Sequence, residues 1–119
     1  MTFIGLVALL HTTTGKVGHI RAEMAQAKAD MHHNLLHIQR LCKLDAPTRD
    51  KQITPELKKA LNLTDAPMSG RQVITHMIKS YKKAMLKFEQ SVKDLAIAKE
   101  HHKNALKTME RYIEHERNP

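Results

Sequence analysis

Residues 69–116 decide the fold, and they read SGRQVITHMIKSYKKAMLKFEQSVKDLAIAKEHHKNALKTMERYIEHE. The stretch has no proline, and its one glycine, Gly70, lies in its first turn, so nothing interrupts an α-helix. Ser69 and Gln72 have the Ser-x-x-Gln spacing of a capping box, in which each side chain accepts a hydrogen bond from the other residue's backbone N–H. The pattern predicts one helix over 70–116, far longer than the usual ~11–12 residues.

Bulky and small side chains recur along this helix every seven residues in three neighbouring rows, named here by heptad position. The a row holds Ile74, Tyr81, Phe88, Leu95, His102 and Met109. The central d row holds Met77, Ala84, Ser91, Ala98, Ala105 and Tyr112. The e row holds Ile78, Met85, Val92, Lys99, Leu106 and Ile113. Because a two-stranded coiled coil needs only a and d, three rows favour a bundle, and the small d-row residues let another backbone approach closely.

The long helix is therefore predicted to be a surface for helical partners. Its predicted interface residues are Ile74, Met77, Ile78, Tyr81, Met85, Phe88, Val92, Leu95, Ala98, Leu106, Met109 and Ile113. Its first turn carries Arg71 and no acid, whereas its last turn carries Glu114 and Glu116. Both ends oppose the charge preference of the helix dipole, so we expect this helix to depend on packing for its stability.

The sequence before residue 69 predicts three shorter helices. The apolar run 3–10 is too short for a membrane span of roughly 20 residues and lacks the basic start of a signal peptide, so we expect a docked helix over 3–11. Apolar residues at steps of three and four predict a second helix over 17–44, separated by the weak breaker Thr12-Thr13-Thr14-Gly15. Thr54 and Pro55 predict the start of a short helix over 54–63.

These elements predict an all-α fold with a single domain over 1–119. The 17–44 helix should fold back on the long helix as an antiparallel hairpin, with facing residue numbers that add to roughly 115, so that residues 3–10 would meet 106–112. The 17–44 helix alone can hardly cover the a, d and e rows of the long helix. We therefore expect a homodimer, as a dimeric four-helix bundle or coiled coil, or a complex with another helical protein.

The chain is basic, with 20 Lys and Arg against 12 acids and a formal charge of +8. Such a balance attracts nucleic acid, acidic proteins or anionic lipid without choosing among them. The candidate phosphate contacts are Arg71, Lys79, Lys82, Lys83, Lys87, Lys103, Lys107 and Arg111. Nucleic acid stays the alternative partner, because few aromatic residues are present for base stacking and no helix-turn-helix is evident.

The candidate chemical residues do not form a catalytic set. His33 and His37 have the i, i+4 spacing of two zinc ligands, but Asn34 stands where zinc proteases carry their general base, and His101 lies far along the hairpin. We expect no metal, no cofactor and no enzymatic activity. The single cysteine, Cys42, cannot form an intrachain disulfide, which favours a reducing, cytoplasmic location.

The expected function is therefore that of a non-enzymatic helical interaction protein, such as a chaperone, adaptor or assembly subunit. This expectation rests on architecture, which is a weak guide to function.

Overall fold

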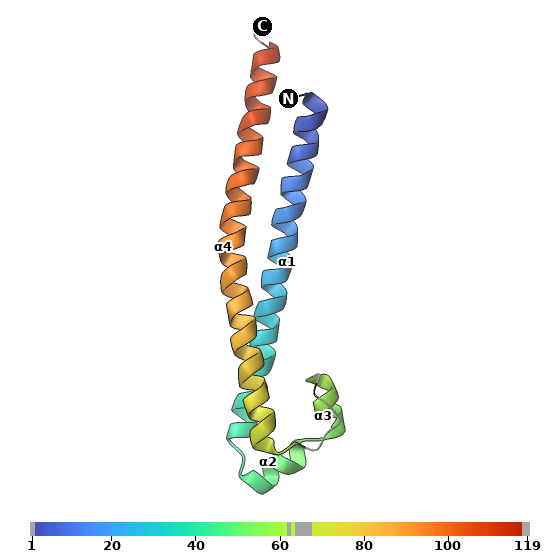
Figure 1. Ribbon diagram of the computed structural model, residues 1–119, viewed down its shortest axis with the longest axis vertical. Helices are drawn as coiled ribbons and strands as arrows, with labels where there is room; N and C mark the ends of the chain where they lie inside the picture. The colour runs from blue at the N-terminus through green and yellow to red at the C-terminus, as the bar shows by residue number, and fades with distance from the viewer. Residues whose placement is uncertain (1, 62, 64–67, 118–119) are drawn as a thin grey trace. The chain divides into compact units, whose positions relative to one another are not determined.

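A computed structural model describes residues 2–61, 63 and 68–117, and about 91% of these are helical. The helices are α1 (Phe3–Cys42), α2 (Ala46–Gln52), α3 (Pro55–Ala60) and α4 (Gly70–Arg117) (Figure 1). The described ranges contain no strand, which confirms the predicted all-α fold, and α1 and α4 pack against each other. None of these helices is long and apolar enough to cross a membrane.

Chain contacts divide the protein into two compact units. Unit 1 contains Met1–Gln26 and Lys87–Pro119, which form the first part of α1 and the last part of α4. Unit 2 contains Ala27–Leu86, with the rest of both long helices and the whole of α2 and α3.

The helix α1 is continuous, which corrects the expectation of separate helices over 3–11 and 17–44. The hydroxyls of Thr12 and Thr13 donate to carbonyl oxygens one turn earlier, at 2.9 and 3.1 Å, so these side chains do not compete with the helix. A glycine such as Gly15 costs only about 1 kcal/mol within a helix, which packing of the apolar residues on either side offsets.

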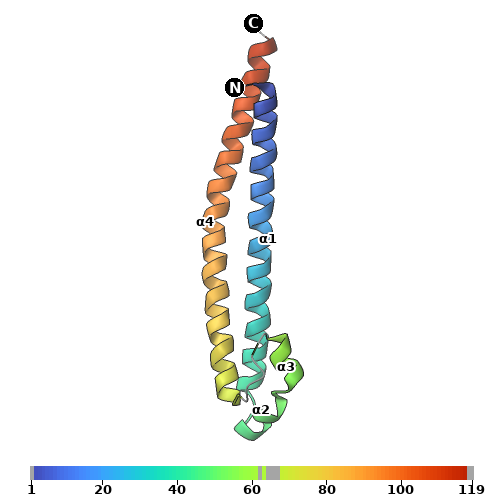
Figure 2. The ribbon, with the colours of Figure 1, turned by 45° about the vertical axis from the view of Figure 1, so that its right-hand side comes forward.

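In unit 1, α1 and α4 run antiparallel (Figure 2). Thr13 Oγ1 lies 2.8 Å from His102 Nδ1, and the ring centroids of Phe3 and Tyr112 lie 6.0 Å apart. The numbers of both pairs, 13 with 102 and 3 with 112, add to 115. The expected register, in which the first residues of the chain meet the end of the long helix, is thereby confirmed.

This register places large side chains of α1 opposite small side chains of α4 in unit 1. The facing positions are Leu10 with Ala105, Val17 with Ala98, and Met24 with Ser91. The three small residues are buried, and the three large ones are half-buried. Alternation of size fills the space between two helices at the density of a protein interior, so the d row predicted as a path for another backbone is occupied by α1.

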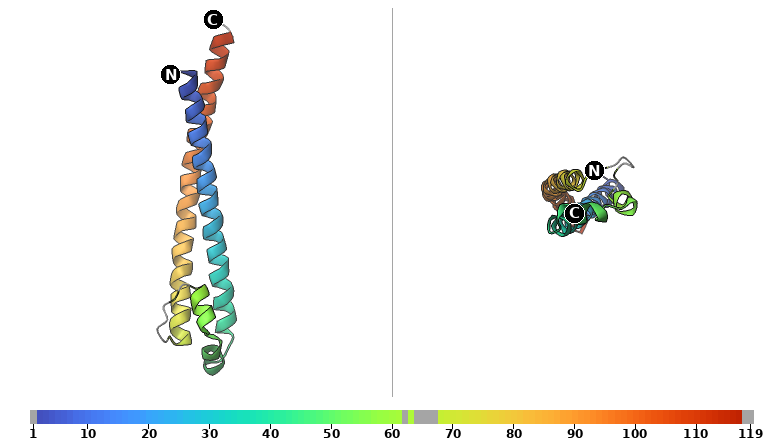
Figure 3. Two further views of the ribbon diagram at one scale, coloured as in Figure 1. Left: turned by 90° about the vertical axis from the view of Figure 1, so that its right-hand side faces the viewer. Right: turned by 90° about the horizontal axis from the view of Figure 1, so that it is seen from below.

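In unit 2, a core forms where α1 ends and α4 begins (Figure 3). Its fully buried members are Leu41, Val73 and Met77. The half-buried side chains around them are Ile38, Leu44, Ile53, Leu61, Leu63, Met68 and Ile74. Full burial of one such side chain contributes about 1.5–3 kcal/mol, so this core anchors the segments that connect the long helices.

The helix α2 joins the ends of both long helices in unit 2. The Arg49 guanidinium donates to the carbonyl oxygens of Leu41 and Leu44 at 3.2 and 3.0 Å, and Asp50 Oδ1 accepts from the Gly70 N–H at 3.0 Å. A cation therefore lies at the C-terminal end of α1 and an anion at the N-terminal end of α4, as helix dipoles favour. Asp50 supplies the acid that the first turn of α4 lacks.

Side-chain caps define the start of each helix after α1. Asp45 accepts from the Thr48 N–H at 3.3 Å and thereby caps α2, a helix that was not predicted. Thr54 caps α3, which covers 55–60 of the expected 54–63; residue 62 lies outside the described residues. The predicted capping box of α4 is confirmed, with Ser69 and Gln72 side chains accepting at 3.2 and 2.8 Å.

Candidate interaction surface

Packing within the chain uses the d row of α4 and leaves most of the e row outside. The buried d-row residues are Met77, Ala84, Ser91, Ala98 and Ala105. The a row is half-buried except for Met109, which is buried. Met77, Ala98 and Met109, which were predicted to face a partner, therefore contribute to contacts inside the chain.

The e row provides four of the apolar side chains that packing leaves exposed on α4, and Leu86 and Ile97 are exposed on this helix outside the row. Its exposed members, Ile78, Val92, Leu106 and Ile113, are between 39% and 45% exposed, and Met85 is half-buried. Single exposed apolar residues are normal on protein surfaces, but in unit 1 three of them, Val92, Leu106 and Ile113, lie on one face of α4, with Lys99 between the first two. These side chains form the part of the predicted interface that remains available.

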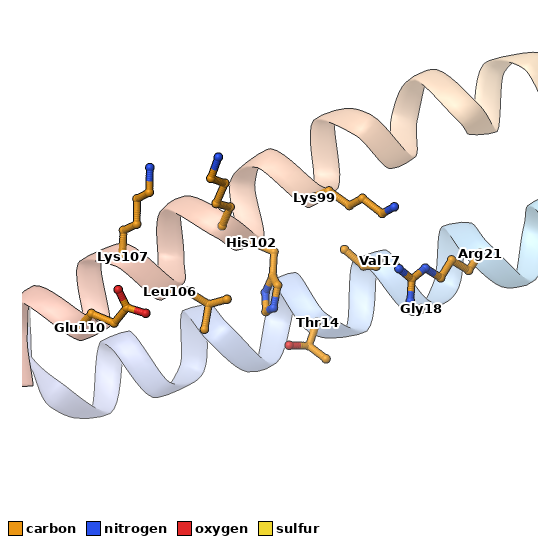
Figure 4. Close-up of a pocket in the computed structure, with 10 residues that line it drawn as sticks. Thr14, Val17, Gly18, Arg21, Lys99, His102, Leu106, Lys107 and Glu110 are labelled. Atoms are coloured by element: carbon orange, nitrogen blue, oxygen red, sulfur yellow. The ribbon is translucent and has the colours of Figure 1, made fainter.

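A groove of about 650 Å³ lies beside this row in unit 1, between α1 and α4 (Figure 4). Its residues on α4 are Lys99, His102, Lys103, Leu106, Lys107 and Glu110. Its residues on α1 are Thr14, Val17, Gly18 and Arg21. Leu106 and His102 project from α4 toward α1, whereas Glu110 lies at one end of the groove and Lys99 and Arg21 lie at the other.

Gly18 leaves the α1 side of the groove open. A Cβ added at Gly18 would meet no heavy atom within 4 Å, and the same is true at Gly15, which does not line the groove. The residues from α1 were not among the predicted site residues. The signal that could have found them is the spacing of Val7, Thr14 and Arg21, which repeat every seven residues beside the buried face of α1.

His102 has a structural hydrogen bond in addition to its place in the groove. Its Nδ1 lies 2.8 Å from Thr13 Oγ1, and while the Thr13 hydroxyl donates to the Leu10 carbonyl oxygen it accepts from the Nδ1–H tautomer of His102. Both side chains are half-buried, so this bond satisfies polar atoms within an otherwise apolar contact. The hydrogen bond gives His102 a structural role in the contact between α1 and α4.

The eight candidate phosphate contacts are all exposed and are divided equally between the two units. Lys103 and Lys107 line the groove of unit 1. Arg71 and Lys79 border a separate shallow hollow of about 330 Å³ in unit 2, together with Met68, Gln72, Thr75 and His76. Lys82, Lys83, Lys87 and Arg111 line neither hollow.

The two histidines with zinc-like spacing contact each other in unit 2. The ring centroids of His33 and His37 lie 4.6 Å apart in an edge-to-face arrangement, and His37 Nδ1 is buried with no hydrogen-bond partner among the described atoms. Burial lowers the pKa of His37 below its usual 6.5, and the positive charges of His33 and Arg40 lower it further. Among the described residues, no three metal-binding side chains come together.

No known protein family, curated protein or solved structure matches this chain. Its function is therefore inferred from its own residues and contacts.

Proposed function

We propose that this protein is a non-enzymatic helical interaction protein, acting as a chaperone, adaptor or assembly subunit. The observation that carries the proposal is the exposed e row of α4, which remains after α1 has covered the d row. Another helix laid on this row would extend the antiparallel pair toward a coiled-coil or four-helix bundle arrangement. The added helix belongs either to a second copy or to a different helical protein.

The area left on the e row limits how strong this contact can be. Full burial of an exposed Val, Leu or Ile contributes about 1.5–3 kcal/mol, so covering four side chains that are roughly two-fifths exposed contributes on the order of 3–5 kcal/mol. Micromolar affinity needs about 8 kcal/mol. A partner must therefore add contacts with neighbouring charged residues or with other exposed apolar residues.

The mass of the protein in solution tests self-association. Light scattering between about 1 and 100 µM should show masses above the 13.6 kDa of one chain if a second copy covers the e row. Leu106→Asp should return the mass toward that of one chain, because it places a charge on the e row. Ile97→Asp is the matched control, since Ile97 is 55% exposed but lies off the e row.

The control separates the e row from general surface hydrophobicity. Equal effects of Leu106→Asp and Ile97→Asp would contradict a role for the row. A single-chain mass at every concentration, combined with failure to bind the helical peptide described below, would contradict the proposed function.

A reducing compartment suits this role, and we propose the cytoplasm. Cys42 is exposed and is the one cysteine of the chain, so an oxidising environment would promote unwanted disulfides between copies.

Nucleic-acid binding is the second candidate, supported by the exposure of all eight predicted cations. Phosphate binding depends steeply on salt, because each neutralised phosphate releases a counterion. Retention of single- or double-stranded DNA at about 50 mM salt, lost by about 200 mM and reduced by Lys82→Glu with Lys83→Glu, would support it. Absence of retention at the lower salt would contradict it.

A further inference from the structure

We infer that the groove of unit 1 binds an acidic amphipathic helix of a different protein. This inference rests on the proposed function and specifies the chemistry of the partner. The groove is lined over 99–110 of α4, which is about three helical turns or roughly 16 Å of helix. A partner helix of three or more turns would lie along it, with apolar residues toward the chain and acids at the edges.

The groove combines an apolar surface with a basic rim. Val17 and Leu106 supply apolar surface from the two helices, and Gly18 leaves room for an incoming side chain. Beyond the groove, the next e-row residue after Leu106 is the exposed Ile113, whereas Lys99 separates Leu106 from the exposed Val92. A binding surface that continues past one pocket suits an extended helix better than a small molecule.

Positive charge in unit 1 is concentrated at this groove. The described residues of the unit include nine Lys and Arg and seven Asp and Glu. The groove is lined by four of these cations, namely Arg21, Lys99, Lys103 and Lys107, and by one acid, Glu110. The rest of the unit therefore has five cations and six acids, so the groove selects an acidic partner where the remaining surface does not.

Charge also argues against a second copy of this chain in the groove. An isologous dimer centred on this groove would bring the four cations of one copy close to the four of the other. Like charges that meet across an interface disfavour the complex.

Nucleic acid fits this groove less well than an acidic helix. The lining has no Phe, Tyr or Trp on which a base could stack. Its apolar residues would gain little from contact with phosphates, whereas the apolar face of an amphipathic helix would cover them.

The experiment measures binding of a synthetic helix of about 20 residues, long enough to populate a helix, with Leu on one face, Glu beside it and one Trp. Because the protein has no Trp, the fluorescence of the peptide reports binding directly. A peptide of the same composition in scrambled order keeps the charge and loses the apolar stripe. We expect the amphipathic peptide to bind about tenfold more tightly than the scrambled one.

Two matched pairs of variants locate the binding site. Gly18→Leu fills the groove, whereas Gly15→Leu makes the same change on α1 outside it, and neither new side chain has a close neighbour at its Cβ. Lys103→Glu reverses a groove charge, whereas Lys83→Glu reverses an exposed charge of unit 2. We expect Gly18→Leu and Lys103→Glu each to weaken peptide binding about tenfold, with no more than about a twofold change for their controls.

Each result supports or overturns the inference. Equal binding of the scrambled peptide would show that charge alone acts, and equal effects of the paired variants would place binding elsewhere; both overturn it. Binding of a single-stranded oligonucleotide, lost in Lys103→Glu while the peptide does not bind, would assign the groove to nucleic acid and overturn it as well. Self-association through Leu106 without peptide binding would overturn the inference and leave the proposed function standing.

Discussion

Ala98→Leu tests the large-against-small packing of the two long helices most directly. Ala98 is 2% exposed and falls opposite the half-buried Val17 in the register of unit 1. Leu adds three carbon atoms where the backbones have no space for them, and overpacking of this kind costs about 1–3 kcal/mol. For a chain of 119 residues, 1 kcal/mol corresponds to roughly 4 °C in Tm, so we expect a decrease of about 4–12 °C.

The matched control is Ala96→Leu, on the same helix. Ala96 is exposed, and Leu has nearly the helix propensity of Ala, so the free energy of unfolding should change by no more than about 0.5 kcal/mol. Thermal and urea unfolding, followed by the helical circular dichroism signal at one protein concentration, measures both variants.

A double variant shows whether Val17 is the side chain that the introduced leucine would meet. Val17→Ala alone should destabilise by removing apolar contact, but in the Ala98→Leu background it should restore part of the lost stability. The two changes should therefore be non-additive by at least about 0.5 kcal/mol. Equal Tm values for Ala98→Leu and Ala96→Leu, or strict additivity with Val17→Ala, would refute the packing described here.

Three further changes test other parts of the fold. Gly15→Ala should stabilise the chain by about 0.5–1 kcal/mol in urea unfolding, because its Cβ has open space and glycine weakens a helix; destabilisation would contradict the continuous α1. Arg49→Ala should lower the free energy of unfolding by about 1–2 kcal/mol, because it removes hydrogen bonds to the end of α1. Lys51→Ala, at an exposed position, should lower it by under about 0.5 kcal/mol, and equal losses would contradict this role of Arg49. Burial lowers the folded-state pKa of His37, so stability should be unaffected well above pH 6.5 and should fall as the pH drops through 6.5. His37→Gln should reduce this dependence of Tm on pH. An unchanged slope of Tm against pH would exclude His37 as its source.

The sequence predicts the long helix α4 well because its signals are local and repeat. The capping box at Ser69 and the threonine cap at Thr54 form the hydrogen bonds that their spacing predicts. The register of unit 1 also follows from the sequence, because the lengths of the two helices and of their connection leave little choice. The contact of Phe3 with Tyr112 confirms it.

The sequence analysis was wrong where one pattern has two meanings. Thr12-Thr13-Thr14-Gly15 suggests a break by propensity, but burial of flanking apolar residues against α4 outweighs a preference of about 1 kcal/mol. Asp45, Ala46 and Pro47 follow the predicted end of the 17–44 helix, but they begin α2, because Asp is a favoured N-cap and Pro fits the first turn; α1 itself ends at Cys42.

The groove could not be predicted for a different reason. It arises from the juxtaposition of Gly18 and Arg21 with Lys99 and Leu106, which are about 80 residues apart in the chain and meet only once the register is fixed. The row spacing indicates which faces are neighbours, but only the packed side chains determine where space remains between them.

The hydrogen bond between Thr13 and His102 helps to fix the register of two helices whose sequences repeat. Both helices present apolar residues every seven positions, so a shift by one repeat would still bring apolar rows together. Such a shift would set Thr13 against Leu95 or Met109 and remove the hydrogen bond between two half-buried side chains, whose net contribution is about 0.5–1.5 kcal/mol. This one polar contact thus favours the native register over registers shifted by seven residues, as single polar residues do in coiled coils.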